Sequence, residues 1–258
     1  MKFIYTLLIV SFVLNAYSKQ PVLMFKNHQF KIVQFTDLHL INGKDFAERN
    51  DSTYALMRNV IKSENPDMVL ITGDIVVSHG AAQIWHEVIQ PMSEAHVPFA
   101  VTFGNHDTEG DMSKSNILKL LQKNQYNLTS NVDTKLSGVG NCSLPVFASE
   151  GKAMPWALYL FDSHAYTNDS TLGYYDWIKN DQIQWYRKQS AVYQLEQGKS
   201  ISALAFFHIP LPEFEAIRNQ KDILGSIGEP VASPQINSGL FASFIEQGGV
   251  DKMRPDSD

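Results

Sequence analysis

The stretch VTFGNHDTEG, from Val101 to Gly110, combines an apolar run with an abrupt polar end. The β-branched and apolar residues stop at Gly104, and an amide, an imidazole and a carboxylate follow in Asn105, His106 and Asp107. A short apolar run bounded by glycine predicts a buried strand. The polar residues after it form either an ordinary turn or one part of a site, depending on the partners that the rest of the chain supplies.

The segments around this stretch alternate between strand and helix patterns. We predict strands over residues 31–36, 67–74 and 97–107, and helical patterns over 51–66, 81–96 and 113–124. The first helix has an N-cap choice at Asp51 or Ser52 and ends at Pro66, and the second is disturbed at Pro91. This alternation predicts an α/β domain with a largely parallel sheet and right-handed crossovers.

The second half of the chain repeats these signals less regularly. Residues 128–149 are rich in loop formers, and strand-like runs follow at 153–163 and at 202–209, the latter stopped by prolines. Between these runs lies an amphipathic helix pattern over 177–198, and a late one covers 237–249.

Polar residues with metal-binding side chains gather where these strands end. Asp37 and His39 follow the first strand, Asp74 the second, Asn105 the third and His208 a later one. Ligands bind at the carboxyl ends of strands in open α/β sheets, so we expect one shared site. Carboxylates mixed with imidazoles suit Mn, Fe or Zn, and a carboxylate that bridges two cations gives a two-metal site.

Length, charge and the N-terminus set further limits. The chain of 258 residues can form one large α/β domain or at most two small ones, and its net charge of −6 argues against a general nucleic-acid binder. Residues 1–18 are typical of a signal peptide, so we expect a secreted protein without stable membrane insertion after cleavage. Its lone Cys142 cannot form an intrachain disulfide, and Asn-x-Ser/Thr sequons occur at Asn50, Asn127, Asn141 and Asn168.

The ordered motifs identify a family resemblance. Asp37-x-His39, Gly73-Asp74, Gly104-Asn105-His106-Asp107 and His208 resemble those of the calcineurin-like metallophosphoesterase superfamily. The segments FTDLHL, ITGDIV, FGNHDTEG, WIKNDQIQWY and FHIPLPEF are similar to its small purple-acid-phosphatase-like branch. The resemblance covers residues 31–249 and implies an α/β fold with a two-sheet β-sandwich flanked by helices, within a domain over 19–249.

The resemblance also implies roles for single residues. Asp37 and His39 would bind one divalent metal ion, Asp74 would bridge two, and Asn105 and His208 would bind the second. His106 would act on the phosphate or the leaving group. Asp107 would orient His106, as a carboxylate commonly steadies an imidazole.

Two positions depart from the pattern of the resembled family. Val77 stands where purple acid phosphatases place a tyrosine ligand, which predicts a colourless protein with a relaxed metal preference. The Gly-His-x-His motif that supplies one histidine to each metal is not found after FIEQGGV, where an atypical polar tail covers 250–258. We therefore expect a second sheet that is incomplete and a domain that is truncated at its C-terminus.

Two functions follow as alternatives. One is a metal-dependent phosphoesterase that hydrolyses phosphate mono- or diesters of a small phosphorylated substrate by attack of a metal-bound hydroxide. The other is a catalytically silent relative that keeps part of the fold and a partial metal site. The number of metal ions that the chain binds distinguishes the two.

Overall fold

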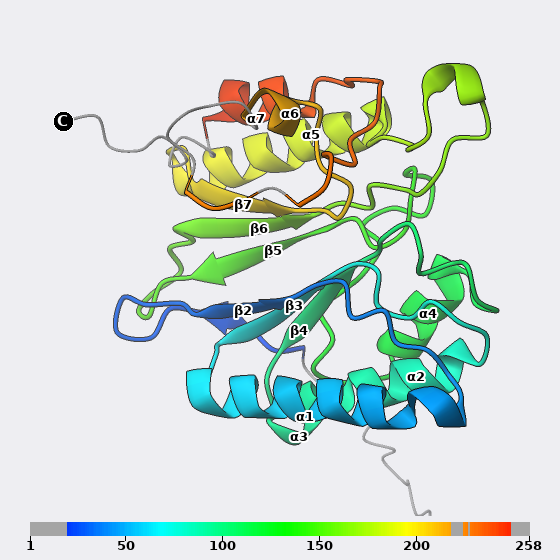
Figure 1. Cartoon of the computed structure of the whole chain (residues 1–258). Coiled ribbons are helices and arrows are strands. Elements are labelled where there is room, and N and C mark those ends of the chain that lie inside the picture. Colours follow the sequence, from blue (N-terminus) through cyan, green and yellow to red (C-terminus); the bar gives the residue numbers. More distant parts are fainter. Residues whose placement is uncertain (1–19, 218–223, 227, 249–258) are drawn as a thin grey trace, which may run out of the picture.

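The strands and helices form four layers, in the order helices, sheet, sheet, helices (Figure 1). The structure, a computed structural model, describes residues 20–217, 224–226 and 228–248. The expected signal peptide over 1–18 and the polar tail over 250–258 lie outside the described residues. This layering confirms the predicted two-sheet α/β sandwich flanked by helices.

The first sheet consists of three parallel strands. They are β2 (Ile32–Phe35), β3 (Met68–Thr72) and β4 (Phe99–Thr102), in the order β2-β3-β4. Every residue of β3 and β4 is buried, because helices cover one face of the sheet and the second sheet covers the other. The predicted parallel sheet is confirmed.

Helices from the first half of the chain cover the outer face of this sheet. They are η1 (Lys44–Phe46), α1 (Ala47–Glu64), α2 (Ala81–Val88), α3 (Gln90–Glu94) and α4 (Lys114–Leu121). The predicted start of α1 at Asp51 or Ser52 was wrong, because η1 runs directly into α1 and supplies its first turn. The end was correct: Asn65 adopts a left-handed conformation (φ 45°) just before Pro66.

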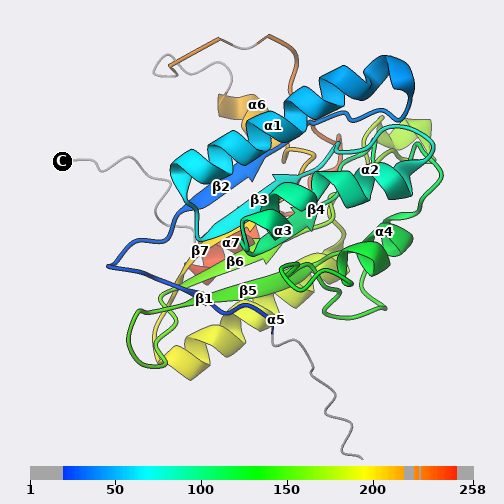
Figure 2. The same cartoon turned by 90° about the horizontal axis from the view of Figure 1, so that it is seen from below.

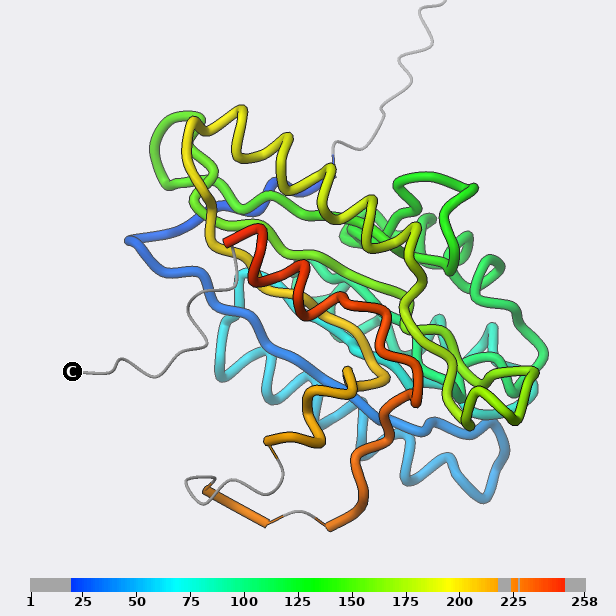
Figure 3. Tube along the Cα trace, turned by 90° about the horizontal axis from the view of Figure 1, so that it is seen from above, coloured from blue at the N-terminus to red at the C-terminus, as the bar shows by residue number. Residues whose placement is uncertain are grey.

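The second sheet is mixed. It contains β1 (Leu23–Met24), β5 (Cys142–Phe147), β6 (Trp156–Leu160) and β7 (Ser202–Phe206), in the order β1-β5-β6-β7. Only β5 and β6 pair antiparallel, and β7 lies at one edge of the sheet as far as the described residues show. Helices α5 (Asn180–Gln197), α6 (Glu213–Ile217) and α7 (Leu240–Gln247) lie on the outer side of this sheet, as the views from below and from above show (Figure 2, Figure 3). The short η2 (Ser170–Leu172) lies in the loop between β6 and α5.

Apolar side chains fill the three spaces between the layers. In β3, Val69 and Ile71 pack towards the helices, whereas Met68 and Leu70 pack towards the second sheet. This division follows from the two-residue period of a strand. In the described part of the chain, no helix is both long and apolar enough to span a bilayer.

Candidate metal centre

The loops that follow β2 and β3 are paired beyond the ends of their strands. The backbone N–H of Asp37 donates to the carbonyl oxygen of Gly73 (3.1 Å), and that of His39 donates to the carbonyl oxygen of Asp74 (3.0 Å). The two predicted ligands of the first loop are thereby fixed beside the predicted bridging carboxylate of the second.

Three of the predicted ligands have an unusual backbone. Asp37, His39 and Asp74 all adopt positive φ angles, of 53°, 45° and 53°. A non-glycine residue in this region carries a cost of about 1–3 kcal/mol, and such residues cluster at functional sites. The surrounding hydrogen bonds hold the backbone of these residues in the left-handed conformation, which an isolated loop would not retain.

Asp74 lies at the centre of the site and is only 4% exposed. Its Oδ1 accepts a hydrogen bond from the backbone N–H of His106 (2.9 Å). Its Oδ2 lies 3.1 Å from Nε2 of His208 and 3.9 Å from Nε2 of both His39 and His106. One ligand atom each of Asp37, Asp74 and His208 lies within 4.8 Å of the others. The structure thus brings four of the predicted strand-end residues around one carboxylate.

Two glycines make room for these side chains. A Cβ on Gly73 (φ 96°) would lie 2.5 Å from Nδ1 of His208, and one on Gly104 would lie 2.1 Å from Oδ1 of Asp74. Gly73 therefore serves both the turn and the approach of the histidine. Gly104 does not have a positive φ, so it is needed for the space that Asp74 occupies.

His208 reaches the site from the second sheet, directly after β7. Its Nδ1 lies 2.8 Å from the carbonyl oxygen of Thr72, so the ring donates there and presents Nε2 to Asp74. Burial lowers the pKa of His208, but the hydrogen bond to Asp74 outweighs it and the pKa is raised. Burial likewise raises the pKa of Asp74, and the contacts with His208 and His106 more than offset it and lower that pKa. The two groups stabilise each other's charged forms.

Asp107 has a different role from the predicted one. Its carboxylate accepts hydrogen bonds from the backbone N–H groups of Asp74 (3.1 Å), Ile75 (2.7 Å), Val76 (3.2 Å) and Gly104 (2.8 Å). The side chain is buried, which raises its pKa against the lowering effect of these bonds. The prediction that Asp107 orients the imidazole of His106 was wrong, because both of its oxygens are used in holding the β3 and β4 loops together.

Glu109 makes the contact that was assigned to Asp107. Its Oε1 lies 2.7 Å from Nδ1 of His106, which leaves Nε2 of the ring facing Asp74. Because the two residues lie three positions apart in an irregular loop, no periodic sequence pattern predicts their contact. A carboxylate on one ring nitrogen fixes the tautomer and the orientation of an imidazole.

Tyr166 is a second site residue that sequence reasoning missed. Its hydroxyl oxygen accepts a hydrogen bond from Nδ2 of Asn105 (2.7 Å), and its ring lies edge-on to that of His106 at 6.2 Å between centroids. Because the amide nitrogen is engaged, the amide oxygen of Asn105 is the atom left for a cation. Tyr166 follows β6 in the second sheet, so only the folded chain brings it here.

The residues around Asp74 match the donor set of a divalent metal site. Aspartate oxygens, an amide oxygen and imidazole nitrogens are the ligands that Mn, Fe and Zn share. Asp74 is buried with one oxygen directed at several imidazoles, as a carboxylate shared by two cations would be. Asp37, His39, Asp74, Asn105 and His208 would hold such cations, and the donor chemistry fits.

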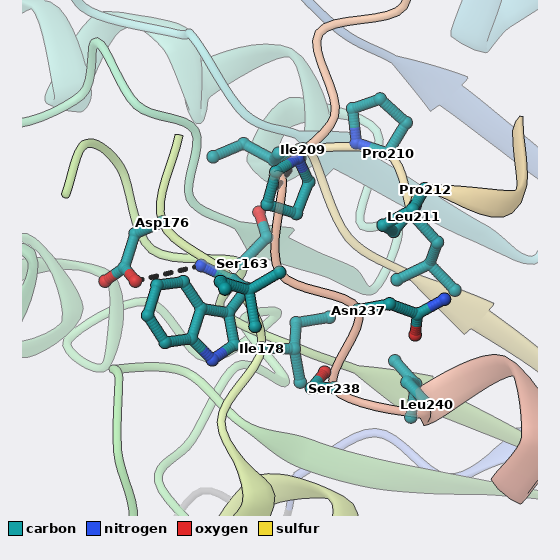
Figure 4. Close-up of a pocket in the computed structure, with 13 residues that line it drawn as sticks. Ser163, Asp176, Ile178, Ile209, Pro210, Leu211, Pro212, Asn237, Ser238 and Leu240 are labelled. Atoms are coloured by element: carbon teal, nitrogen blue, oxygen red, sulfur yellow. Dashed lines mark hydrogen bonds between the residues drawn. The ribbon is translucent and has the colours of Figure 1, made fainter. Parts of the chain in front are cut away.

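A small cavity is lined in part by the segment that follows His208 in the chain (Figure 4). Its volume is about 10 Å³, the size of one water molecule, and it is lined by Ile209, Leu211 and Leu240 among others. The hydroxyl of the buried Ser163 accepts a hydrogen bond from the backbone N–H of Ile209 (2.9 Å). This hydrogen bond helps to hold the segment after His208 in place, and the cavity itself is too small for a substrate.

Comparisons with known proteins place the chain in a family. The family model described as calcineurin-like phosphoesterase matches residues 30–251. The chain is 30% identical over 254 residues to "Probable inactive purple acid phosphatase 14" of Arabidopsis thaliana, covering 86% of this chain and 63% of that protein. It is also 30% identical over 239 residues to "Phosphatase DCR2" of Saccharomyces cerevisiae, covering 81% and 40%.

The chain thus spans less than two thirds of the length of these relatives. Among solved structures, a dimetal phosphatase from Danio rerio aligns with a TM-score of 0.49 at 13% identity, over 71% of each chain. The family model matches most of this chain and includes every strand end that contributes to the site. The chain belongs to the calcineurin-like phosphoesterase family.

Proposed function

We propose that the chain is a divalent-metal-dependent phosphoesterase that acts on a small phosphorylated substrate. The arrangement that carries this proposal is the buried carboxylate of Asp74, with Nε2 of His208 at 3.1 Å and Nε2 of His39 and of His106 at 3.9 Å. When bound, two divalent cations such as Mn, Fe or Zn would supply water activation and neutralise the charge of the phosphate.

The chain's own residues have separate tasks in this proposal. Asp37, His39, Asp74, Asn105 and His208 bind the cations and set their positions. His106, held at Nδ1 by Glu109, directs Nε2 to the phosphate, where it donates a hydrogen bond or a proton to the leaving oxygen. Asp107 keeps the backbone of the bridging loop in its left-handed conformation.

Metal content and hydrolysis of p-nitrophenyl phosphate, measured together, test this function. We expect two metal ions per purified chain by elemental mass spectrometry after dialysis against trace Mn, Fe and Zn, and turnover that a chelator removes. Asp74→Asn should lower kcat/KM by about 100-fold or more, because this carboxylate would hold both cations. Glu150→Gln, an exposed carboxylate in the β5–β6 turn, is the matched control. Unchanged activity in Asp74→Asn would exclude the two-metal assignment.

A second candidate is a catalytically silent relative with a partial metal site. It is favoured by the finding that, among the described residues, only Asp37, Asp74 and His208 bring three His, Cys or acidic ligand atoms within 4.8 Å of one another. One metal ion or none per chain, without turnover, would support it over the phosphoesterase.

We also propose a secretory location for the protein. This rests on the signal-peptide pattern of residues 1–18 and on the sequons. Expression with the natural N-terminus in a eukaryotic host, followed by N-terminal sequencing of the secreted product, tests it. A product that begins near Lys19 supports the proposal, and retention of Met1 in the cytosol contradicts it.

A further inference from the structure

Three tyrosines form a compact cluster in the loop between β6 and α5. The ring centroids of Tyr166 and Tyr174 lie 4.9 Å apart, those of Tyr174 and Tyr175 lie 5.0 Å apart, and those of Tyr166 and Tyr175 lie 6.1 Å apart. Aromatic pairs at these separations attract one another through the edges and faces of their rings. We call Tyr166, Tyr174 and Tyr175 the tyrosine cluster.

The loop that carries the cluster is held in place by backbone hydrogen bonds. Thr167 N–H donates to the carbonyl oxygen of Tyr174 (3.0 Å), and Asp176 N–H donates to that of Ala165 (3.0 Å). Gly173 turns the chain just before the cluster (φ 101°), and a Cβ there would lie 2.9 Å from the side chain of Gln235. The two tyrosine-bearing segments thus form a short antiparallel ladder, and the cluster exists before any ligand binds.

The cluster extends from the metal centre out to solvent. Tyr166 contacts the centre directly, through its hydrogen bond with Asn105 and its edge-on contact with His106. Tyr175 is partly buried and lies opposite Tyr166 across the antiparallel bridge between the two segments. Tyr174 lies at the outer end and is 67% exposed. A group that leaves the phosphate on the side of His106 would lie along these rings.

The chemistry of the tyrosine cluster favours one kind of leaving group. Tyrosine rings offer apolar faces and edges, so a flat aromatic ring gains more contact area and stacking than an open-chain or sugar alcohol does. Stacking of one base on an aromatic side chain improves affinity by about tenfold. We propose that the tyrosine cluster is the leaving-group subsite, and that the chain prefers phosphate esters of alcohols that carry a planar aromatic ring. This rests on the proposed phosphoesterase function.

A matched pair of substrates tests the preference. Adenosine 5′-monophosphate and ribose 5-phosphate share the same phosphate and the same leaving oxygen and differ in the base. We expect kcat/KM to be about tenfold higher for the nucleotide. Tyr174→Ala should bring this ratio close to 1 by lowering the value for the nucleotide, and Tyr174→Phe should keep it. Leu195→Ala, an exposed apolar residue on α5, is the control that keeps the ratio.

Binding of the corresponding phosphonates, in which a methylene group replaces the bridging oxygen, gives a readout without turnover. By calorimetry we expect about tenfold tighter binding of the nucleotide phosphonate, and loss of this difference in Tyr174→Ala. Equal affinities, including failure of both to bind, would overturn the subsite, as would a preference that Tyr174→Ala leaves intact. A preserved binding preference without any hydrolysis would count against the phosphoesterase function alone.

Discussion

Nε2 of His208 and Oδ2 of Asp74 lie 3.1 Å apart, although the two residues follow strands of different sheets. His208 comes after β7 in the second sheet, and Asp74 comes after β3 in the first. The pair therefore forms only when both sheets are packed together. Any change that weakens the packing of the two sheets should therefore also weaken this contact.

The stability of the metal-free chain should depend on pH through this pair. The pKa of His208 is raised above 6.5, so its contribution is full below pH 6.5 and is lost as the pH rises through the folded pKa. The pKa of Asp74 is lowered below 3.8, so its contribution is present above pH 3.8 and is lost as the pH falls through the folded pKa. Both contributions are complete between these values. Thermal unfolding in a chelator should show His208→Ala most destabilising between pH 4 and 6.5, and a pH-independent difference would contradict this.

Gly104→Ala should damage the site through a steric clash. The new Cβ would lie 2.1 Å from Oδ1 and 2.5 Å from the backbone nitrogen of the buried Asp74, so the loop or the carboxylate would have to shift. We expect a loss of about 1–3 kcal/mol in the free energy of unfolding, as for other overpacked sites, together with weaker metal binding. Urea denaturation and metal titration measure the two effects.

Gly228→Ala is the control for this substitution. Among the residues that the structure describes, a Cβ at Gly228 meets no heavy atom within 4 Å, and its φ is not in the left-handed region. It should change stability by less than about 0.5 kcal/mol. A Gly104→Ala protein as stable and as rich in metal as Gly228→Ala would show that the loops adapt.

Asp107→Asn and Glu109→Gln should separate folding from catalysis. Asp107 accepts four backbone hydrogen bonds in a buried setting, and an amide would turn one acceptor into a donor that faces N–H groups. We expect Asp107→Asn to lower the free energy of unfolding by about 2–4 kcal/mol. Because Glu109 is half-exposed, Glu109→Gln should have little effect on the free energy of unfolding, measured by urea denaturation.

The effect of Glu109 should appear in turnover. Glu109→Ala removes the acceptor on Nδ1 of His106 and should lower kcat by about tenfold or more, with metal content retained. Glu109→Gln keeps an acceptor oxygen and should recover part of that loss. If Asp107→Asn impaired only turnover and Glu109→Ala only stability, the two assignments would have to be exchanged.

One of the four sequons should accept a glycan. The side-chain amides of Asn50, Asn127 and Asn141 are buried, and each donates a hydrogen bond to a backbone carbonyl oxygen. Asn168 is exposed in the loop between β6 and α5. In a eukaryotic secretory host we expect enzymatic deglycosylation to remove one glycan, because a modified amide cannot occupy the three buried positions.

Two variants identify the modified position. Asn168→Gln and Ser170→Ala destroy the same sequon by different changes, and both should remove the mass shift. Glycopeptide mass spectrometry that finds a glycan on one of the buried asparagines of the folded protein would contradict this prediction.

The sequence determined the first half of the fold and the identity of the polar side chains that gather around Asp74. β2, β3 and β4 were predictable because their apolar runs are short and bounded by Gly or polar residues, and Asp37, His39, Asp74 and Asn105 follow them within a few positions. The carboxyl ends of parallel strands meet at one edge, so local pattern alone implied proximity. The start of α1 was missed because η1 extends it without a capping side chain.

Only the tertiary structure decided which residues orient the site. Asp107 follows His106 directly, but its side chain points into the protein and accepts hydrogen bonds from the backbone of the loop after β3. Glu109 contacts the imidazole of His106 instead. The position of Tyr166 at the site and the burial of the sequon asparagines depend on contacts between segments far apart in the chain. No local sequence pattern encodes such contacts. Side-chain direction in an irregular loop is set by long-range hydrogen bonds, and these exist only once the two sheets have packed.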